Sequence, residues 1–344
     1  MRVLAVCVVL GFALAGCGEK AEPGSGSAPG KLEPFTLILD YFPNADHAGI
    51  YAAQAAGEYR KAGLDVKIVV PPDPAAPLKL LRAGKADAVI SYEPELLLAR
   101  DHGATNLVSV GALVQTPLTS LMAIGSSKVR SPKDLAGKRV ATAGIPYQSA
   151  YLKTILEKAG VDPGSVKETN VGFNLVPAML SKKADATLGA FWNYEGVDLE
   201  QRGKDPRIFR MEDLGVPTYD ELIFVARRQD LDQLGASKLR RFLQATARGH
   251  QLLRKDPAIG VDALLKADDG LSRKLQEAAV KETLPVFFPS DAKHPFGWQD
   301  PDAWSAYAAW MFENKLLQND PGAAARPFTN EFLPGEGLDP GPSD

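Results

Sequence analysis

The chain has 344 residues, of which 45% are hydrophobic and 24% are charged, and its formal net charge is only −3. A charge this small, without any block of Lys or Arg, excludes proteins that bind nucleic acid through an extended basic surface. Both cysteines, Cys7 and Cys17, lie near the N-terminus, so the rest of the chain has neither a disulfide nor a cysteine metal ligand. Such a chain must be stabilised by its hydrophobic core, and it is long enough for two lobes.

The N-terminus has the layout of a secretory signal. Met1 and Arg2 precede an apolar run over residues 3–15, which is shorter than the roughly 20 residues of a membrane-spanning helix. The run ends in Leu-Ala-Gly-Cys at Cys17, which resembles the lipobox of bacterial lipoproteins. The resemblance implies a signal peptide over 1–16 and a lipid on Cys17 that anchors the protein outside the cytoplasm, at the bacterial cell envelope. The alternative is an ordinary signal in which Cys17 is incidental. Residues 17–33 are rich in Gly, Ser and Pro and predict a flexible tether.

Strand and helix patterns alternate after the tether. We predict strands at 35–39, 64–70, 88–90, 107–110, 121–124, 138–143, 166–171, 186–190 and 219–226. We predict helices at 46–62, 77–83, 94–102, 146–159 and 175–181, then at 237–254, 257–266, 272–282 and 301–317. The alternation predicts an α/β fold with mostly parallel sheets, followed by a helical region.

A short segment occurs twice. Lys-Ala-Asp-Ala begins at Lys85 and again at Lys183, each time between a helix pattern and a strand pattern. The repetition predicts two related α/β units with the same turn before one strand. We place lobe 1 at 34–117 plus 219–330, lobe 2 at 118–218, and an irregular tail at 331–344.

Aromatic and acidic residues follow several of the predicted strands. Ligands of open α/β sheets bind beyond the carboxyl ends of the strands. We therefore predict a ligand site made of Asp40, Tyr41, Asn44, His47, Ser91, Tyr92, Glu93, Gly144, Phe173, Asn174, Trp192, Tyr194, Glu195, Tyr219 and Glu221. Aromatic faces and carboxylates together suit a flat ring that carries N–H donors. Structural roles are the alternatives: Asn44 as a helix cap, His47 in packing, and Glu93 as a first-turn acid.

The sequence has few features of an enzyme. It contains no Gly-x-Ser-x-Gly elbow and no His-Glu-x-x-His, and its four histidines are scattered. We predict neither a bound metal nor a cofactor.

Nine segments resemble bacterial solute-binding proteins of the thiamine-pyrimidine-precursor (ThiY-like) type. They are residues 39–51, 63–66, 74–78, 83–87, 91–95, 131–138, 172–174, 189–195 and 215–221. The resemblance implies the type II periplasmic-binding-protein fold, with two lobes, a two-segment hinge near 116–120 and 215–219, and a ligand between the lobes. It also implies a monomer that delivers an aminopyrimidine to the permease of an ABC importer. In this interpretation the ring stacks on Tyr41 or Trp192, and Glu195 accepts from its exocyclic amine.

The same superfamily includes the yeast-type thiamine pyrimidine synthase, which this chain resembles around 84–87. The pyridoxal-binding lysine of that enzyme falls at Ser91 here, its sacrificed histidine at Glu95, and its cysteine-rich motif near 215–221, where this chain has no cysteine. Without a lysine no Schiff base forms there, so we predict a binding protein rather than an enzyme. Riboflavin, or a sulfonate or nitrate, are the alternative ligands. The acids Asp40, Glu93, Glu195 and Glu221 disfavour an oxyanion.

Overall fold

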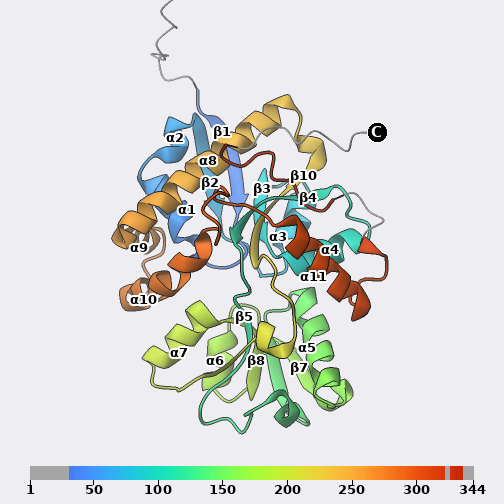
Figure 1. Ribbon diagram of the computed structural model, residues 1–344. Helices are drawn as coiled ribbons and strands as arrows, with labels where there is room; N and C mark the ends of the chain where they lie inside the picture. The colour runs from blue at the N-terminus through green and yellow to red at the C-terminus, as the bar shows by residue number, and fades with distance from the viewer. Residues whose placement is uncertain (1–30, 322–325, 336–344) are drawn as a thin grey trace, which may run out of the picture. The chain divides into compact units, whose positions relative to one another are not determined.

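The computed structural model describes residues 31–321 and 326–335. The predictions for the signal peptide, for Cys17 and for residues 18–30 and 336–344 lie outside these residues. All elements described below belong to one compact unit, Leu32–Asp344. Within the described ranges, no helix is both long and apolar enough to cross a membrane. Figure 1 shows two β-sheets, each with its own helices.

The first sheet has the strand order β2-β1-β3-β10-β4. Its strands are β1 (Glu33–Ile38), β2 (Leu64–Val69), β3 (Ala88–Ser91), β4 (Leu107–Val114) and β10 (Leu222–Arg227). β1 is parallel to β2 and β3, whereas β10 is antiparallel to β3 and β4. We call this sheet and its helices lobe 1.

The second sheet has the order β7-β6-β8-β5-β9. Its strands are β5 (Thr119–Ala123), β6 (Arg139–Thr142), β7 (Lys167–Asn170), β8 (Ala186–Phe191) and β9 (Arg207–Arg210). β5 is antiparallel to both of its neighbours, and β6 is parallel to both of its own. We call this sheet and its helices lobe 2.

Mostly parallel sheets were predicted, and each sheet differs from this prediction by one reversed strand: β10 in lobe 1 and β5 in lobe 2. The reversed strands, β5 and β10, are the first strands formed after the chain passes from one sheet to the other. A chain that leaves the carboxyl end of a strand in one sheet enters the other sheet from the facing edge. Its first strand there must run away from that edge, against the strands that end at it.

The helices surround the sheets of their own lobe (Figure 1). They are α1 (Ala48–Ala55), α2 (Glu58–Lys61), α3 (Pro77–Arg82), α4 (Glu93–Asp101), α5 (Pro146–Lys158), α6 (Leu175–Leu180), α7 (Val197–Gln201), α8 (Gln233–Lys255), α9 (Pro257–Ala267), α10 (Arg273–Thr283) and α11 (Pro301–Glu313). The predicted helix 46–62 is interrupted because Gly57, with φ of 70°, separates α1 from α2. The helix predicted over 301–317 ends at Glu313, two residues before Lys315 turns into the left-handed region with φ of 61°.

The repeated Lys-Ala-Asp-Ala segment forms the same device in each lobe. The Asp87 carboxylate accepts from Thr36 N of β1 at 2.7 Å, and the Asp185 carboxylate accepts from Arg139 N of β6 at 3.0 Å. In return, the backbone N–H of Asp87 donates to Thr36 O, and that of Asp185 donates to Arg139 O. The residue before each repeat, Gly84 in one copy and Lys182 in the other, has a left-handed backbone conformation. The repeat thus ties one helix turn to the amino end of a neighbouring strand, at the edge of the sheet away from the strand carboxyl ends.

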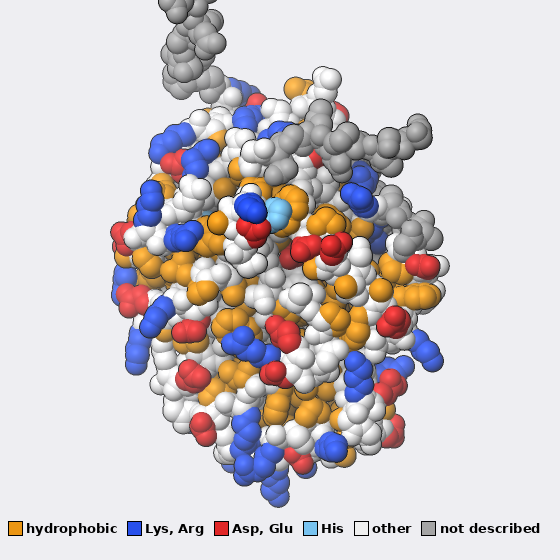
Figure 2. Space-filling model, in the orientation of Figure 1, with side chains coloured by type: hydrophobic (Ala, Val, Ile, Leu, Met, Phe, Trp, Pro, Cys, Tyr) orange, Lys and Arg blue, Asp and Glu red, His pale blue; other side chains and the backbone are white. Residues whose placement is uncertain are grey.

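The hydrophobic core fills both sheets, and all eight residues of β4 are buried. The core extends further than predicted at the C-terminus, because Phe332 and Leu333 are buried although we assigned them to an irregular tail. Lys, Arg, Asp and Glu side chains are interspersed on the face shown in Figure 2.

Candidate functional site

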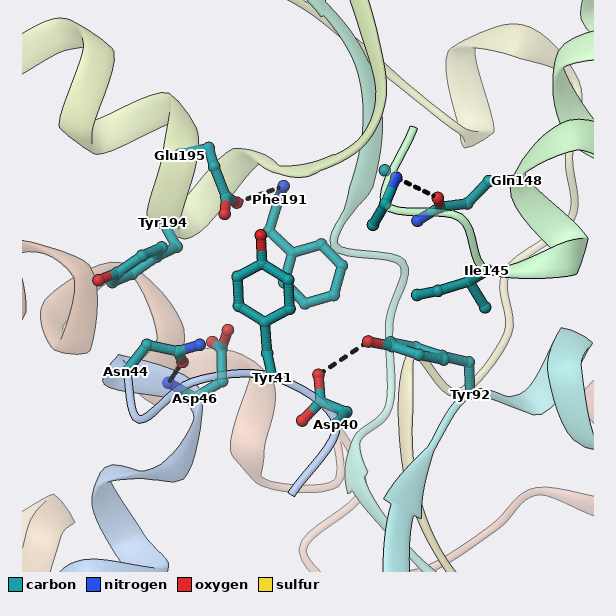
Figure 3. A pocket seen from close by; sticks show the side chains of 12 residues that line it. Asp40, Tyr41, Asn44, Asp46, Tyr92, Ile145, Gln148, Phe191, Tyr194 and Glu195 are labelled. Carbon is teal, nitrogen blue, oxygen red and sulfur yellow. Dashed lines mark hydrogen bonds between the residues drawn. The ribbon is translucent and has the colours of Figure 1, made fainter. Parts of the chain in front are cut away.

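A narrow pocket lies where the strands of both sheets end (Figure 3). Its enclosed space is small, and part of the pocket is open to solvent. Twelve residues from both lobes line it: Asp40, Tyr41, Asn44, Asp46, Tyr92, Ala143, Ile145, Gln148, Gly189, Phe191, Tyr194 and Glu195. Six of these were predicted from the sequence, namely Asp40, Tyr41, Asn44, Tyr92, Tyr194 and Glu195.

The loop after β1 supplies the lobe 1 side of the pocket. It leads into the short helical turn η1 (Ala45–His47), which Asn44 caps by accepting from Asp46 N at 2.8 Å. The His47 ring contacts Asp40 at 2.9 Å, and the Tyr92 hydroxyl donates to the other Asp40 oxygen at 2.9 Å. Both oxygens of Asp40 therefore have partners. Asn44 is a helix cap and also lines the pocket, whereas His47 is fully buried behind it and holds Asp40 in place.

The turn after β8 supplies the lobe 2 side. It is a π-helical turn, η4 (Trp192–Gly196), a geometry that is common at functional sites. The Glu195 carboxylate accepts from Phe191 N at 2.8 Å and points into the pocket (Figure 3). Gln148, at the start of α5, accepts from Ala143 N at 2.8 Å, which fixes its amide beside the pocket.

Tyr41 stands in the middle of the pocket in Figure 3. Its ring contacts Phe42, with 4.5 Å between centroids, and meets Phe173 of lobe 2 edge-on at 4.7 Å. Its buried hydroxyl has no hydrogen-bond partner in the described structure. Burial and the nearby Glu195 carboxyl raise the pKa of Tyr41 well above its usual value, so the hydroxyl stays protonated. A ring that enters the pocket must therefore displace Tyr41 or stack beside it.

The pocket is acidic, and its acids are buried. None of its lining residues is Lys or Arg, and three are carboxylates: Asp40, Asp46 and Glu195. Burial raises the pKa of Glu195 to about 8 and that of Asp46 to about 6. Asp46 is 1% exposed, and its Oδ2 atom has no partner in the described structure. The site can therefore hold N–H donors and disfavours anions.

Trp192 does not line this pocket, so it offers no stacking surface there. The Arg210 guanidinium lies 4.0 Å from the Trp192 ring centroid, and the indole N–H donates to Pro117 O at 2.9 Å. Trp192 and Arg210 instead help to line a separate surface depression. Four further predicted residues do not line the pocket either: Ser91, Gly144, Phe173 and Asn174. Ser91 donates to Glu95 at 2.8 Å, and Asn174 is exposed.

Three predicted ligand residues lie in or beside the segments that connect the lobes. Tyr219 and Glu221 belong to the segment before β10, and Glu93, the first residue of α4, contacts that segment. Glu221 is fully buried and accepts from Leu118 N at 2.7 Å, Thr119 N at 2.8 Å and the Thr119 hydroxyl at 2.9 Å. The Tyr219 hydroxyl donates to Glu221 at 3.0 Å. Glu93 accepts from Asp220 N at 2.7 Å. Glu221 thus joins the two connecting segments to each other, Glu93 holds one of them, and neither acid lines the pocket.

Six lining residues escaped prediction: Asp46, Ala143, Ile145, Gln148, Gly189 and Phe191. Asp46 lies in a segment that we did single out, only two residues after Asn44. Gln148 follows β6 in the next helix turn, where a polar side chain at a strand end was a usable signal.

Asn193 connects the two lobes beside the pocket. Its Nδ2 donates to Asp46 Oδ1 at 2.6 Å and to the Thr283 hydroxyl of α10 at 2.7 Å. All three side chains are fully or almost fully buried. Asp46 also lines the pocket, so the contact between the lobes uses one of the pocket carboxylates.

Replacing Asn193 with leucine should favour the open form. The change removes both bonds across the lobes and leaves Asp46 without its amide donor, which we expect to disfavour closure by about 1–3 kcal/mol. Small-angle scattering should then give a larger radius of gyration than for the unchanged protein. Asn174→Leu, at an exposed position of lobe 2, is the control and should leave the radius unchanged. If Asn193→Leu and Asn174→Leu had the same radius of gyration, Asn193 would not be needed to hold the lobes together.

The buried acids predict that stability falls with rising pH. Burial raises the pKa of Glu95, Asp220 and Glu221 to about 7 and that of Glu195 to about 8. These carboxyls hold protons that the unfolded chain has released, so their stabilisation is lost as pH rises through 7–8. His250, whose pKa burial lowers to about 4, acts in the opposite sense, but only below pH 6.5.

We therefore expect the free energy of unfolding to fall by a few kcal/mol between pH 6.5 and 8.5. Urea unfolding at the two pH values measures it. Equal stability at both values would show that these carboxyls are ionised without penalty.

Comparison with known proteins gives the family of the chain. The family model described as NMT1/THI5 like matches residues 44–259. The chain is 32% identical to the formylaminopyrimidine-binding protein of Halalkalibacterium halodurans, covering 92% of this chain and 94% of that one. It is 28% identical to the 4-amino-5-hydroxymethyl-2-methylpyrimidine phosphate synthase of Legionella pneumophila, over 87% and 92% of the two chains.

A solved structure shows the fold. A Candida albicans protein described as having the generic periplasmic binding protein structural fold superposes with a TM-score of 0.63 at 16% identity, covering 85% of this chain and 93% of that one. The predicted α/β periplasmic-binding-protein fold is confirmed. The predicted relationship to binding proteins for thiamine pyrimidine precursors is also confirmed. The chain belongs to the NMT1/THI5-like family.

Proposed function

We propose that the chain is a solute-binding protein that encloses a thiamine pyrimidine precursor, of the formylaminopyrimidine or hydroxymethylpyrimidine type, between its lobes. The observation that carries this proposal is a pocket lined by three carboxylates and four aromatic rings, with no Lys or Arg. Carboxylates accept from the amine of such a ring, and aromatic side chains cover its faces. The name of the relative from Halalkalibacterium halodurans points to the same ligand class.

The protein would pass its ligand to the permease of an ABC importer. A ligand of about ten heavy atoms binds tightly only when it is almost completely enclosed. Closure of the lobes about the segments joined by Glu221 would supply that enclosure, and opening would release the ligand to the permease.

An enzyme of the pyrimidine synthase kind is the second candidate, because such synthases are among the relatives. The residues present do not fit pyridoxal phosphate. No lysine lines the pocket, and Ser91 and Glu95, at the positions of the enzyme's lysine and histidine, are buried and bonded to each other. Incubation with pyridoxal phosphate should therefore yield no pyrimidine.

Export and anchoring complete the proposal. The apolar run before Cys17 and the Leu-Ala-Gly-Cys sequence support a signal peptide and a lipid on that cysteine. Expressed in a bacterium, the protein should incorporate labelled palmitate, and Cys17→Ser should abolish the label. Labelling that persists in Cys17→Ser would place any lipid elsewhere.

A thermal-shift screen tests the ligand class. Formylaminopyrimidine and 4-amino-5-hydroxymethyl-2-methylpyrimidine should raise the melting temperature, because a ligand that binds only the folded state stabilises it. Taurine, riboflavin and thiamine serve as the comparison compounds. Stabilisation by riboflavin or taurine, and by neither pyrimidine, would overturn the proposed ligand.

A further inference from the structure

No Lys or Arg lines the pocket to balance its acids. Asp40 is satisfied by His47 and Tyr92, so two acids remain: Asp46 from lobe 1 and Glu195 from lobe 2. Both acids line the same pocket, from opposite lobes (Figure 3).

An unpaired oxygen of Asp46 also indicates that the pocket binds a hydrogen-bond donor. Its Oδ1 accepts from Asn193 at 2.6 Å, whereas its Oδ2 is buried and without a partner. A buried carboxylate oxygen without a donor is unfavourable, and the pocket side chains supply none. The missing donor is therefore expected from the ligand.

We infer that the ligand is bound as its singly protonated cation, an aminopyrimidinium ring that lies between Glu195 of one lobe and Asp46 of the other. This inference rests on the proposed function and adds the charge state of the ligand to it. A protonated aminopyrimidine presents a ring N–H beside its exocyclic amine, and these two donors match the two oxygens of one carboxylate.

The other titratable groups around the two acids do not supply the missing charge. Those that face Glu195 and Asp46 are Asp40, Tyr41, His47, Tyr194 and Asp198, with Tyr92 behind Asp40. His47 lies close enough to lower the pKa of Asp46, but its ring is bonded to Asp40 and donates nothing to Asp46; the rest are acids or neutral phenols. His47 is already bonded to Asp40, so it is not a donor for Asp46 Oδ2, whereas a cationic ring balances one carboxylate and donates to both acids.

The proton balance makes a measurable prediction. The bound proton comes from the ligand, from Glu195 or from solvent, depending on pH. Burial raises the pKa of Glu195 to about 8. Above that value and above the pKa of the free ligand, one proton must be taken up with each ligand bound. The association constant should then fall about tenfold per pH unit.

The location of the proton needs a spectroscopic test, because a proton left on Glu195 would give the same pH dependence. The probe is 4-amino-5-hydroxymethyl-2-methylpyrimidine labelled with ¹⁵N in its ring, bound to the full chain at pH 8.5. We expect the bound ring nitrogen to show the chemical shift of the cation while the free probe shows that of the neutral base. A neutral shift in the bound probe would overturn the inference and leave the proposed function standing. No binding at any pH, measured by calorimetry, would remove the proposed function itself.

Two variants separate this role from a general effect of buried acids. Glu195→Gln should shift the bound probe toward the neutral form and flatten the pH dependence of its affinity. Glu95→Gln replaces another buried acid that does not line the pocket, and it should keep the cation signal. If Glu195→Gln does not fold, two measurements on the unchanged protein still test the charge state of the ligand. These are the tenfold fall of the association constant per pH unit and the ¹⁵N shift of the bound probe. A cation signal that survives in folded Glu195→Gln would exclude Glu195 as the partner.

Discussion

Replacing Glu195 with glutamine should weaken the binding of an aminopyrimidine roughly ten- to a hundred-fold. The glutamine oxygen can still accept from Phe191 N, as the glutamate does at 2.8 Å, so the turn after β8 is kept. Its amide nitrogen, however, cannot accept from the ligand amine, and a buried donor left without an acceptor costs about 1–3 kcal/mol. Titration calorimetry at pH 7 measures the loss.

The same variant should be more stable than the unchanged protein at pH 8.5, because a neutral amide replaces a carboxyl whose ionisation burial opposes. Weaker binding with unchanged or higher stability separates a ligand contact from a folding defect. Glu95→Gln is the matched control and should keep full affinity. Unchanged affinity in Glu195→Gln would remove Glu195 from the ligand site.

Replacing Glu221 with alanine should destabilise the folded protein by about 2–6 kcal/mol. The change leaves two buried N–H groups, those of Leu118 and Thr119, without an acceptor, and each such group costs roughly 1–3 kcal/mol. The hydroxyls of Thr119 and Tyr219 lose the same partner. Urea unfolding at pH 6.5 measures the difference.

Glu221→Gln is the control for this prediction. It retains one acceptor oxygen, so it should fall between Glu221→Ala and the unchanged protein. A Glu221→Ala variant of normal stability would show that water satisfies these groups. The role of Glu221 as the connection between the two hinge segments would then be wrong.

The alternation of strands and helices was readable from the sequence because buried strands are short apolar runs bounded by turn residues. β9 was missed because its four residues begin and end with arginine and are only partly buried at the edge of the sheet. The reversal of β5 and β10 also escaped, since strand direction depends on where the chain crosses between sheets and leaves no local pattern.

The site was predictable where residue type and strand end coincide, as for Asp40, Tyr41 and Glu195. Residues that hold the connecting segments lie at the same edge of the sheets, so Glu93, at the start of α4, and Glu221, just before β10, carry the same sequence signal as ligand contacts. Asp46 and its bond to Asn193 join positions 147 residues apart. No local pattern reports such a contact, because it forms only when the two lobes meet.

Calorimetric titration of the purified protein at pH 7 with 4-amino-5-hydroxymethyl-2-methylpyrimidine and with taurine tests the ligand class most directly. An acidic pocket closed between two lobes predicts saturable one-to-one binding of the pyrimidine and no heat of binding from the sulfonate. Binding of taurine without binding of the pyrimidine would contradict it.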